Sequence, residues 1–246
     1  MAEGGVQVPG VTPRRLETFA GPIHTIVLLL VMIGASVAGY FSVHRLRDTP
    51  NPNRLFFYGV TMAWEWIVVA YIYWGVRRHG KPMRELVGGG WTRARDFFRD
   101  LGIAVSFWIA ALIVLGIAAH VVGTSGGNQA ARTISPRGFQ ESIAWIAVAV
   151  TAGFCEETIF RGYFQKQLAA WTQSAPAGVL LSAGLFGAGH IYQGGKATVI
   201  IGVYGLMFGI LAEVRHSLRP GMMTHAWHDA LAGLAVRFLP KSPSLF

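Results

Sequence analysis

One stretch of the sequence, residues 101–123, reads LGIAVSFWIAALIVLGIAAHVVG. It contains no Asp, Glu, Lys or Arg, and His120 is its one titratable residue. About 20 consecutive apolar residues are enough to cross the hydrocarbon core of a bilayer as a helix. Backbone polar groups in lipid must be satisfied within the segment itself, so residues 101–123 are expected to form a transmembrane helix.

Six other stretches have the same apolar character, and two of them also contain several charged side chains. These stretches are residues 21–43, 55–76, 142–165, 177–195, 197–212 and 220–236. None shows the alternating pattern of an outer-membrane β-barrel. The sequence therefore predicts an all-α, polytopic transmembrane helix bundle of about seven spans, in which charged residues of the later spans line a polar intramembrane cavity.

The composition of the chain agrees with a membrane protein. Of 246 residues, 52% are hydrophobic and only 13% are charged, whereas soluble domains average about 25% charged residues. The formal net charge of +9 does not indicate a nucleic-acid partner, because the basic residues lie between the apolar stretches. Since Cys155 is the single cysteine, intramolecular disulfides and cysteine-rich metal sites are excluded.

Basic residues in the connections predict the orientation. The connection 77–100 contains Arg77, Arg78, Lys81, Arg84, Arg93, Arg95 and Arg99. Loops rich in Lys and Arg stay in the cytoplasm, so this connection, the N-terminus with Arg14 and Arg15, and loop 213–220 are expected there, and the loop 123–139 outside. The first span is expected to be uncleaved, in a bacterial inner membrane. We divide the chain into a three-span region (1–139), a core (140–236) and a tail (237–246).

The charged residues within the spans are candidates for function, because burying charge in a membrane is costly. Residues 154–161 read FCEETIFR. Glu157 and Arg161 are four residues apart and can pair on one helix face, while Glu156 points about 100° away and lacks that partner. Glu156 is thus the carboxylate left to take a proton. The alternative is a surface ion pair at a helix end.

Three further groups of titratable residues within the spans are also candidates for function. His190 follows a run of small residues after Phe186, and His225 lies four residues before Asp229, so that both can address one site. If residues 142–173 form one helix and residues 176–192 return antiparallel to it, Glu156 and His190 lie at the same depth. Depth counting places His225 nearer the cytoplasmic rim, and a tilted or recessed last hairpin would be needed to bring it to the other motifs. Glu65 has no local partner, and its role stays open.

These motifs resemble those of the CPBP intramembrane proteases, also called the Abi family. That family includes type II CAAX prenyl endopeptidases and bacteriocin-immunity proteins. Residues 156–161 match its Glu-Glu-x-x-x-Arg motif, Phe186 to His190 its Phe-x-x-x-His motif, and His225 to Asp229 its His-x-x-x-Asn/Asp motif. The resemblance covers about residues 140–236, and the prenyl-protease members have Asn where this chain has Asp229.

The resemblance implies an intramembrane endopeptidase acting on a membrane-associated peptide or protein. Glu156 with His190 would activate a water, and His225 and Asp229 would stabilise the oxyanion or hold the substrate. Glu157, Arg161 and Phe186 would support them. An ionised Asp229 is a poor oxyanion donor and would have to be protonated or orient His225 instead.

Metal dependence and non-enzymatic functions remain open at this point. Glu156, His190 and His225 could supply three zinc ligands with an open fourth position. No His-Glu-x-x-His motif is present, however, and we favour a glutamate-dependent mechanism without a cofactor. The alternative function is a non-catalytic immunity or binding protein that uses the same cavity. A proton-coupled transporter is disfavoured, because no repeated halves are seen.

Overall fold

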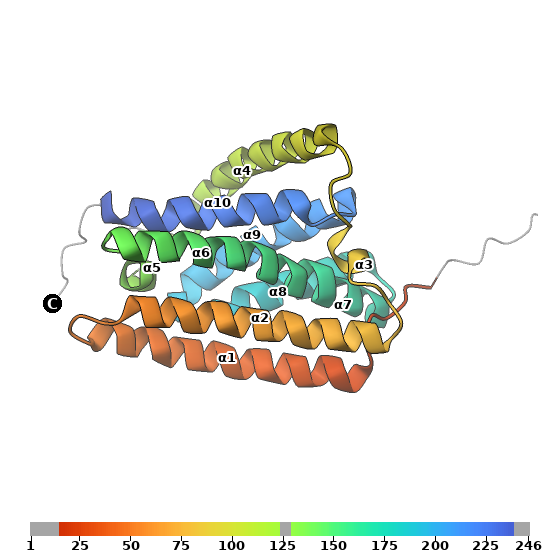
Figure 1. The fold of residues 1–246 in the computed structure, drawn as a ribbon, viewed down its shortest axis with the longest axis horizontal. Coiled ribbons are helices and arrows are strands. Elements are labelled where there is room, and N and C mark those ends of the chain that lie inside the picture. Colours follow the sequence, from red (N-terminus) through yellow and green to blue (C-terminus); the bar gives the residue numbers. More distant parts are fainter. Residues whose placement is uncertain (1–14, 124–128, 239–246) are drawn as a thin grey trace, which may run out of the picture.

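The computed structural model describes residues 15–123 and 129–238, and in these residues all regular secondary structure is helical (Figure 1). Each of the seven predicted stretches is helical. Arg14 and residues 239–246 of the predicted tail lie outside the described residues. The main helices are α1 (Pro22–Asp48), α2 (Arg54–Arg78), α4 (Ala94–Val122), α6 (Phe139–Glu156), α7 (Gln165–Thr172), α8 (Ala175–Gly189), α9 (Gly195–Arg215) and α10 (Arg219–Ala235).

Within residues 15–123 and 129–238, five helical segments are long and apolar enough to cross a membrane, and the chain is an integral membrane protein. They are α1, α2, α4, α9 and the continuous segment Phe139–Thr172. This last segment combines α6, the π-helix η1 (Glu157–Phe164) and α7. With 34 residues it is about 50 Å long at 1.5 Å per residue. It therefore exceeds a hydrocarbon core of about 30 Å, whereas α8 and α10 are shorter than the five spans.

The connections gather at two ends of the bundle (Figure 1). One end holds the start of α4, the end of α7 and the connection from α9 to α10. The segment before α1 docks at this same end, since the backbone N–H of Leu16 donates to the side chain of Gln173. Residues 77–100 and 213–220 thus share one end, as the alternation of spans predicts. The side of the membrane on which this end lies stays a prediction.

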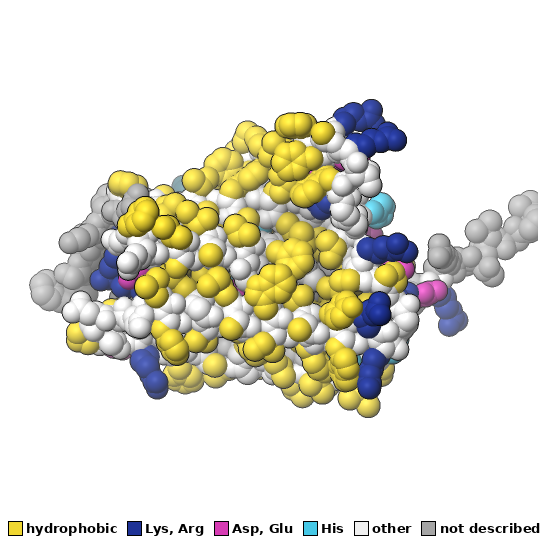
Figure 2. Space-filling view, viewed as in Figure 1, with side chains coloured by type: hydrophobic (Ala, Val, Ile, Leu, Met, Phe, Trp, Pro, Cys, Tyr) yellow, Lys and Arg dark blue, Asp and Glu magenta, His cyan; other side chains and the backbone are white. Residues whose placement is uncertain are grey.

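The surface in Figure 2 is that of a protein surrounded by lipid. Hydrophobic side chains cover the middle of the face, and Lys and Arg lie mainly towards its ends. The exposed apolar side chains include Ile23 and Val121, each 77% exposed, and Phe56 at 71%. Such a broad apolar surface is not stable in water, so the bundle is built for a bilayer.

Two connections contain helices that the sequence did not predict. The short helices are α3 (Arg84–Val87) and α5 (Gln129–Ile134). The hydroxyl of Tyr58 donates to the Ile134 carbonyl and the Arg54 guanidinium to the Thr133 carbonyl, so α2 holds α5 in place. Residues 124–128 of the predicted outer loop lie outside the described residues.

The π-helix η1 is the centre of the core. All eight of its residues are buried, and the Tyr163 hydroxyl contacts Thr25 Oγ1 at 2.8 Å and His24 Nδ1 at 2.9 Å. A π-helix is rare and commonly marks a functional site, because it widens the turn and turns side chains away from their α-helical positions. Here it begins directly after Glu156.

Asp100 on α4 lies at the centre of a group of charged residues that joins α4 to α10. Asp100 is fully buried, and its carboxylate accepts from the indole N–H of Trp91 at 2.9 Å. Nε of Arg219 lies 2.8 Å from the same carboxylate, with Arg215 at 3.6 Å and Arg99 at 3.9 Å. We call these five residues the Asp100 cluster.

Candidate active site

The predicted ion pair within the first motif is present and is fully buried. Nη1 of Arg161 donates to Oε1 of Glu157 at 2.9 Å, and each side chain is 1% exposed. The guanidinium also donates to the Gly205 carbonyl at 3.2 Å. This burial excludes the alternative of a surface pair at a helix end. Removing either partner of such a pair would leave an uncompensated buried charge. Each side chain therefore holds the other in place.

Aromatic rings cover the guanidinium. Its central carbon lies 4.1 Å from the ring centroid of Phe186 and 5.1 Å from that of Phe208. A side chain at Gly205 would clash with Phe186, since an added Cβ would lie 2.9 Å from its ring. Phe186 therefore supports Arg161 through cation–π contact, and it reaches that position because α9 carries glycine opposite it.

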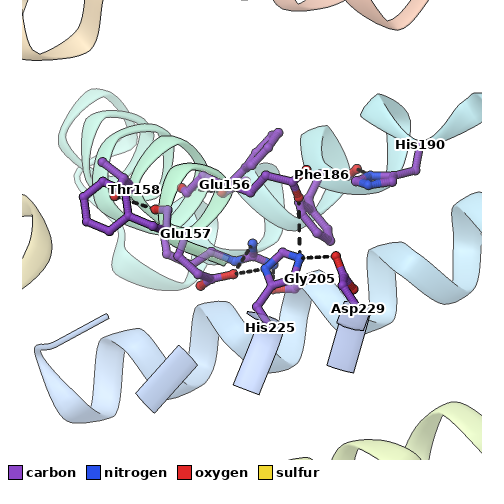
Figure 3. Close-up of polar contacts among 12 residues, drawn as sticks. Glu156, Glu157, Thr158, Phe186, His190, Gly205, His225 and Asp229 are labelled. Atoms are coloured by element: carbon purple, nitrogen blue, oxygen red, sulfur yellow. Dashed lines mark hydrogen bonds and ion pairs between the residues drawn. The ribbon is translucent and has the colours of Figure 1, made fainter. Parts of the chain in front are cut away.

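The imidazole of His225, in the third motif, contacts the two glutamates of the first motif. Its Nδ1 lies 3.0 Å from Oε1 of Glu157, and its Nε2 lies 3.6 Å from Oε2 of Glu156 and 3.5 Å from Oδ2 of Asp229 (Figure 3). An ionised carboxylate can only accept a hydrogen bond. Since Glu157 is paired with Arg161, Nδ1 of His225 is the donor to it. Nε2 is then directed at the space between Glu156 and Asp229.

The prediction that His225 lies towards the rim is wrong, and the reason is where α10 begins. An added Cβ at Gly162 would lie 3.2 Å from Leu218, the residue that precedes α10. Gly162 is ten residues before the end of α7 at Thr172, so α10 starts about 15 Å inside that end. The backbone N–H of Leu218 donates to the carbonyl of Val87, which anchors this recessed start.

Glu156 is the carboxylate without a strong partner, as the sequence predicts. Its side chain is 18% exposed, and its Oε2 is buried with no hydrogen-bond partner among the described residues. The 3.6 Å separation from Nε2 of His225 is longer than a normal hydrogen bond. This oxygen therefore has no donor among the described residues to satisfy it.

His190 is close to the site but is not bonded to Glu156. Its Nδ1 bonds the carbonyl of Phe186 at 2.8 Å, within its own helix turn. No hydrogen bond or ion pair joins it to Glu156 in the part of the chain that the structure describes. Figure 3 shows the ring beyond Phe186, near enough to Asp229 for an electrostatic interaction. Because Nδ1 is taken, Nε2 is the nitrogen left for chemistry.

Sequence reasoning left Glu65 without a role, and the structure places it beside this site. Glu65 is 7% exposed and interacts electrostatically with Glu156, His225 and Asp229. It comes from α2, outside the three motifs. The high cost of burying a carboxyl in a span marks Glu65 as a candidate for function. No spacing in the sequence, however, relates a residue of α2 to residues of α6 or α10.

The proposed zinc ligands do not form a ligand set in this arrangement. Across residues 15–123 and 129–238, no group of three or more His, Cys, Asp or Glu side chains could hold a metal ion. Glu156 and His225 approach each other, but His190 is directed to its own helix. Glu156, His190 and His225 therefore do not form a three-ligand group in this structure, and the chemistry below is written without a metal.

Comparison with known families gives one match. The family described as type II CAAX prenyl endopeptidase, Rce1-like, matches residues 138–231. This segment contains all three motifs, and it confirms the resemblance to the CPBP proteases there. Neither the curated proteins nor the solved structures give a match.

Proposed function

We propose, from the match of residues 138–231 to the Rce1-like type II CAAX prenyl endopeptidases, that the chain is a glutamate-dependent intramembrane endopeptidase. Its substrate would be a membrane-associated peptide or protein that reaches the buried cluster around His225. The observation that carries the proposal is that Glu156, Glu157 and Asp229 converge on this one imidazole.

Glu156 is the general base in this proposal. No hydrogen bond to its carboxylate is found among the described residues, and the side chain is 18% exposed, so the carboxylate can accept a proton from a water as that water attacks the peptide carbonyl. The same carboxyl then returns the proton to the leaving nitrogen. General acid–base catalysis of this kind contributes about 10²- to 10⁴-fold to a rate. His190, whose Nε2 is unoccupied by its own helix, would share the orientation of that water.

In this proposal His225 is an imidazolium with a proton on each ring nitrogen, and its Nε2–H donates to the developing oxyanion. Glu157 fixes its Nδ1, and Asp229 lies 3.5 Å from its Nε2. Asp229 therefore acts by orienting His225, which removes the difficulty of an ionised carboxylate as an oxyanion donor. A fixed N–H aimed at developing charge is an effective catalyst, because it needs no rearrangement during the reaction.

The test is cleavage of internally quenched peptides by the purified protein in lipid nanodiscs. Peptides with a free C-terminal carboxylate are compared with and without a farnesylated cysteine. We expect Glu156→Gln to insert and fold but to lose at least about 100-fold in cleavage rate. The matched control is Glu17→Gln, which changes an exposed glutamate paired with Lys81 and should cleave like the wild type.

Two outcomes would change the proposal. Peptide binding without cleavage by the wild-type protein would favour the non-catalytic immunity or binding function. Stoichiometric zinc in active preparations, lost together with activity and restored with it, would instead support a metalloprotease. Full activity of Glu156→Gln would exclude Glu156 as the base.

A further inference from the structure

We propose that Glu65 is a positioning residue of the same site, a second carboxyl that shares one proton with Glu156. The inference rests on the proposed function. It concerns a residue on α2, outside residues 138–231 and outside the three motifs.

Ring contacts fix the register of α2 against α6. The rings of Tyr58 and Trp145 lie 5.5 Å apart, and those of Trp66 and Phe154 lie 5.4 Å apart. The two helices therefore run parallel (Figure 1), and Glu65 is level with Gly153. Glu156 lies three residues further along, which is about 5 Å along the axis.

Helix α10 meets α6 at this same level. An added Cβ at Gly153 would lie 2.8 Å from the backbone nitrogen of Ala226 and 2.8 Å from the Met222 carbonyl. Ala226 lies between His225 and Asp229 in the chain. The register thus brings Glu65 to the depth of the catalytic cluster, in the middle of α2.

Both glutamates have an unsatisfied oxygen. Oε2 of Glu65 and Oε2 of Glu156 are each buried without a hydrogen-bond partner among the described residues. A buried polar atom without a partner costs about 1–3 kcal/mol, so two such atoms at one level need an explanation. One proton held between the carboxyls, directly or through a water, satisfies both oxygens at once.

The charges around the pair favour one shared proton. Glu65 faces Glu156 and Cys155 on α6, His225 and Asp229 on α10, and Tyr192 on the 3₁₀ turn η2 (Ile191–Gln193). Glu156 also faces Arg161. Close carboxylates in a low dielectric do not both ionise. Glu65 therefore keeps the proton and donates to one oxygen of Glu156, which leaves the other oxygen as the base.

Glu65 acts through Glu156, and its proton is not consumed. The water gives a proton to Glu156 as its oxygen bonds to the carbonyl carbon. When the carbon–nitrogen bond breaks, Glu156 passes this proton to the leaving nitrogen. The pair then again holds one proton, so the reaction needs no co-reactant besides water.

Two substitutions at position 65 separate this role from simple packing. Glu65→Gln keeps a neutral donor, whereas Glu65→Leu keeps volume but removes the donor. We expect Glu65→Leu to lose about 10- to 100-fold in kcat, the value of a hydrogen bond to a charged group, and Glu65→Gln to recover most of it.

A second measurement does not depend on cleavage. Infrared spectra of the wild-type protein in nanodiscs should contain the carbonyl stretch of a protonated carboxyl, which Glu65→Gln should lose and Glu17→Gln should keep. An unchanged band in Glu65→Gln, or a kcat of Glu65→Leu equal to that of the wild type, overturns the inference. Failure of the proposed function looks different, because then the wild type cleaves no peptide while the infrared result still reports on the pair.

Discussion

Two buried groups of charges lie in this bundle, and they differ in their balance. In the Asp100 cluster one carboxylate faces three guanidinium groups, and Arg99, Arg215 and Arg219 are 50%, 30% and 14% exposed. In the cluster around His225, four carboxyls face one guanidinium, and the imidazoles of His225, His190 and His228 lie near them. A group whose acid is fully matched by cations fastens helices together. An excess of acidic side chains in the middle of a span is costly and therefore indicates a functional site.

The largest expected effect comes from breaking the ion pair of Glu157 with Arg161 in the cluster around His225. Arg161→Met leaves Glu157 as an uncompensated buried charge, and the free energy of unfolding should fall by about 3–5 kcal/mol. The double variant Glu157→Gln with Arg161→Met removes both charges and should recover part of that loss. Chemical unfolding of the three proteins in the same detergent measures both values. Equal stability of Arg161→Met and the wild type would contradict the role assigned to this pair.

A smaller effect is expected from moving α6 away from α10, since these helices carry the two halves of the cluster around His225. Gly153→Ala places a methyl group against the backbone of α10, and overpacking of this kind costs about 1–3 kcal/mol. The shift separates Glu156 and Glu157 from His225, so kcat should fall more than KM rises.

The matched control for that substitution is Gly116→Ala on α4. An added Cβ there meets nothing within 4 Å, and alanine is the better helix former by about 1 kcal/mol. The control should therefore be at least as stable as the wild type and cleave normally. If both glycine variants behave alike, close contact between α6 and α10 is not what aligns the site.

Local rules in the sequence predicted much of this structure. Apolar length predicted all seven helices, and the i,i+4 spacing predicted the pair of Glu157 with Arg161. A turn between residues 173 and 176 was also predicted, and the structure has the turn at Gln173, with a φ of 53°, and at Ser174, the N-cap of α8. Each of these features depends on residues close together in the chain.

The features that were missed depend on how separate helices pack. The recessed start of α10 follows from Gly162 and from the bond of Leu218 to Val87, which no periodicity encodes. The place of Glu65 follows from the ring contacts between α2 and α6. The burial of Arg54, which is 4% exposed and holds α5, likewise depends on contacts between separate helices.

The smallest effect is expected in the Asp100 cluster, and it tests whether an excess of cations, as opposed to an excess of acids, marks a group that only joins helices. Asp100→Asn keeps the shape of the side chain and an acceptor for Trp91, but removes the charge that Arg219 meets at 2.8 Å. The arginines are partly exposed and can turn to water, so the loss in unfolding free energy should be about 1 kcal/mol. Cleavage per folded molecule should be unchanged, as measured in nanodiscs beside the wild type. A loss of cleavage as large as that of Glu156→Gln, with stability intact, would show that a cluster with excess cations also takes part in the reaction, and the charge balance would then no longer distinguish the two groups.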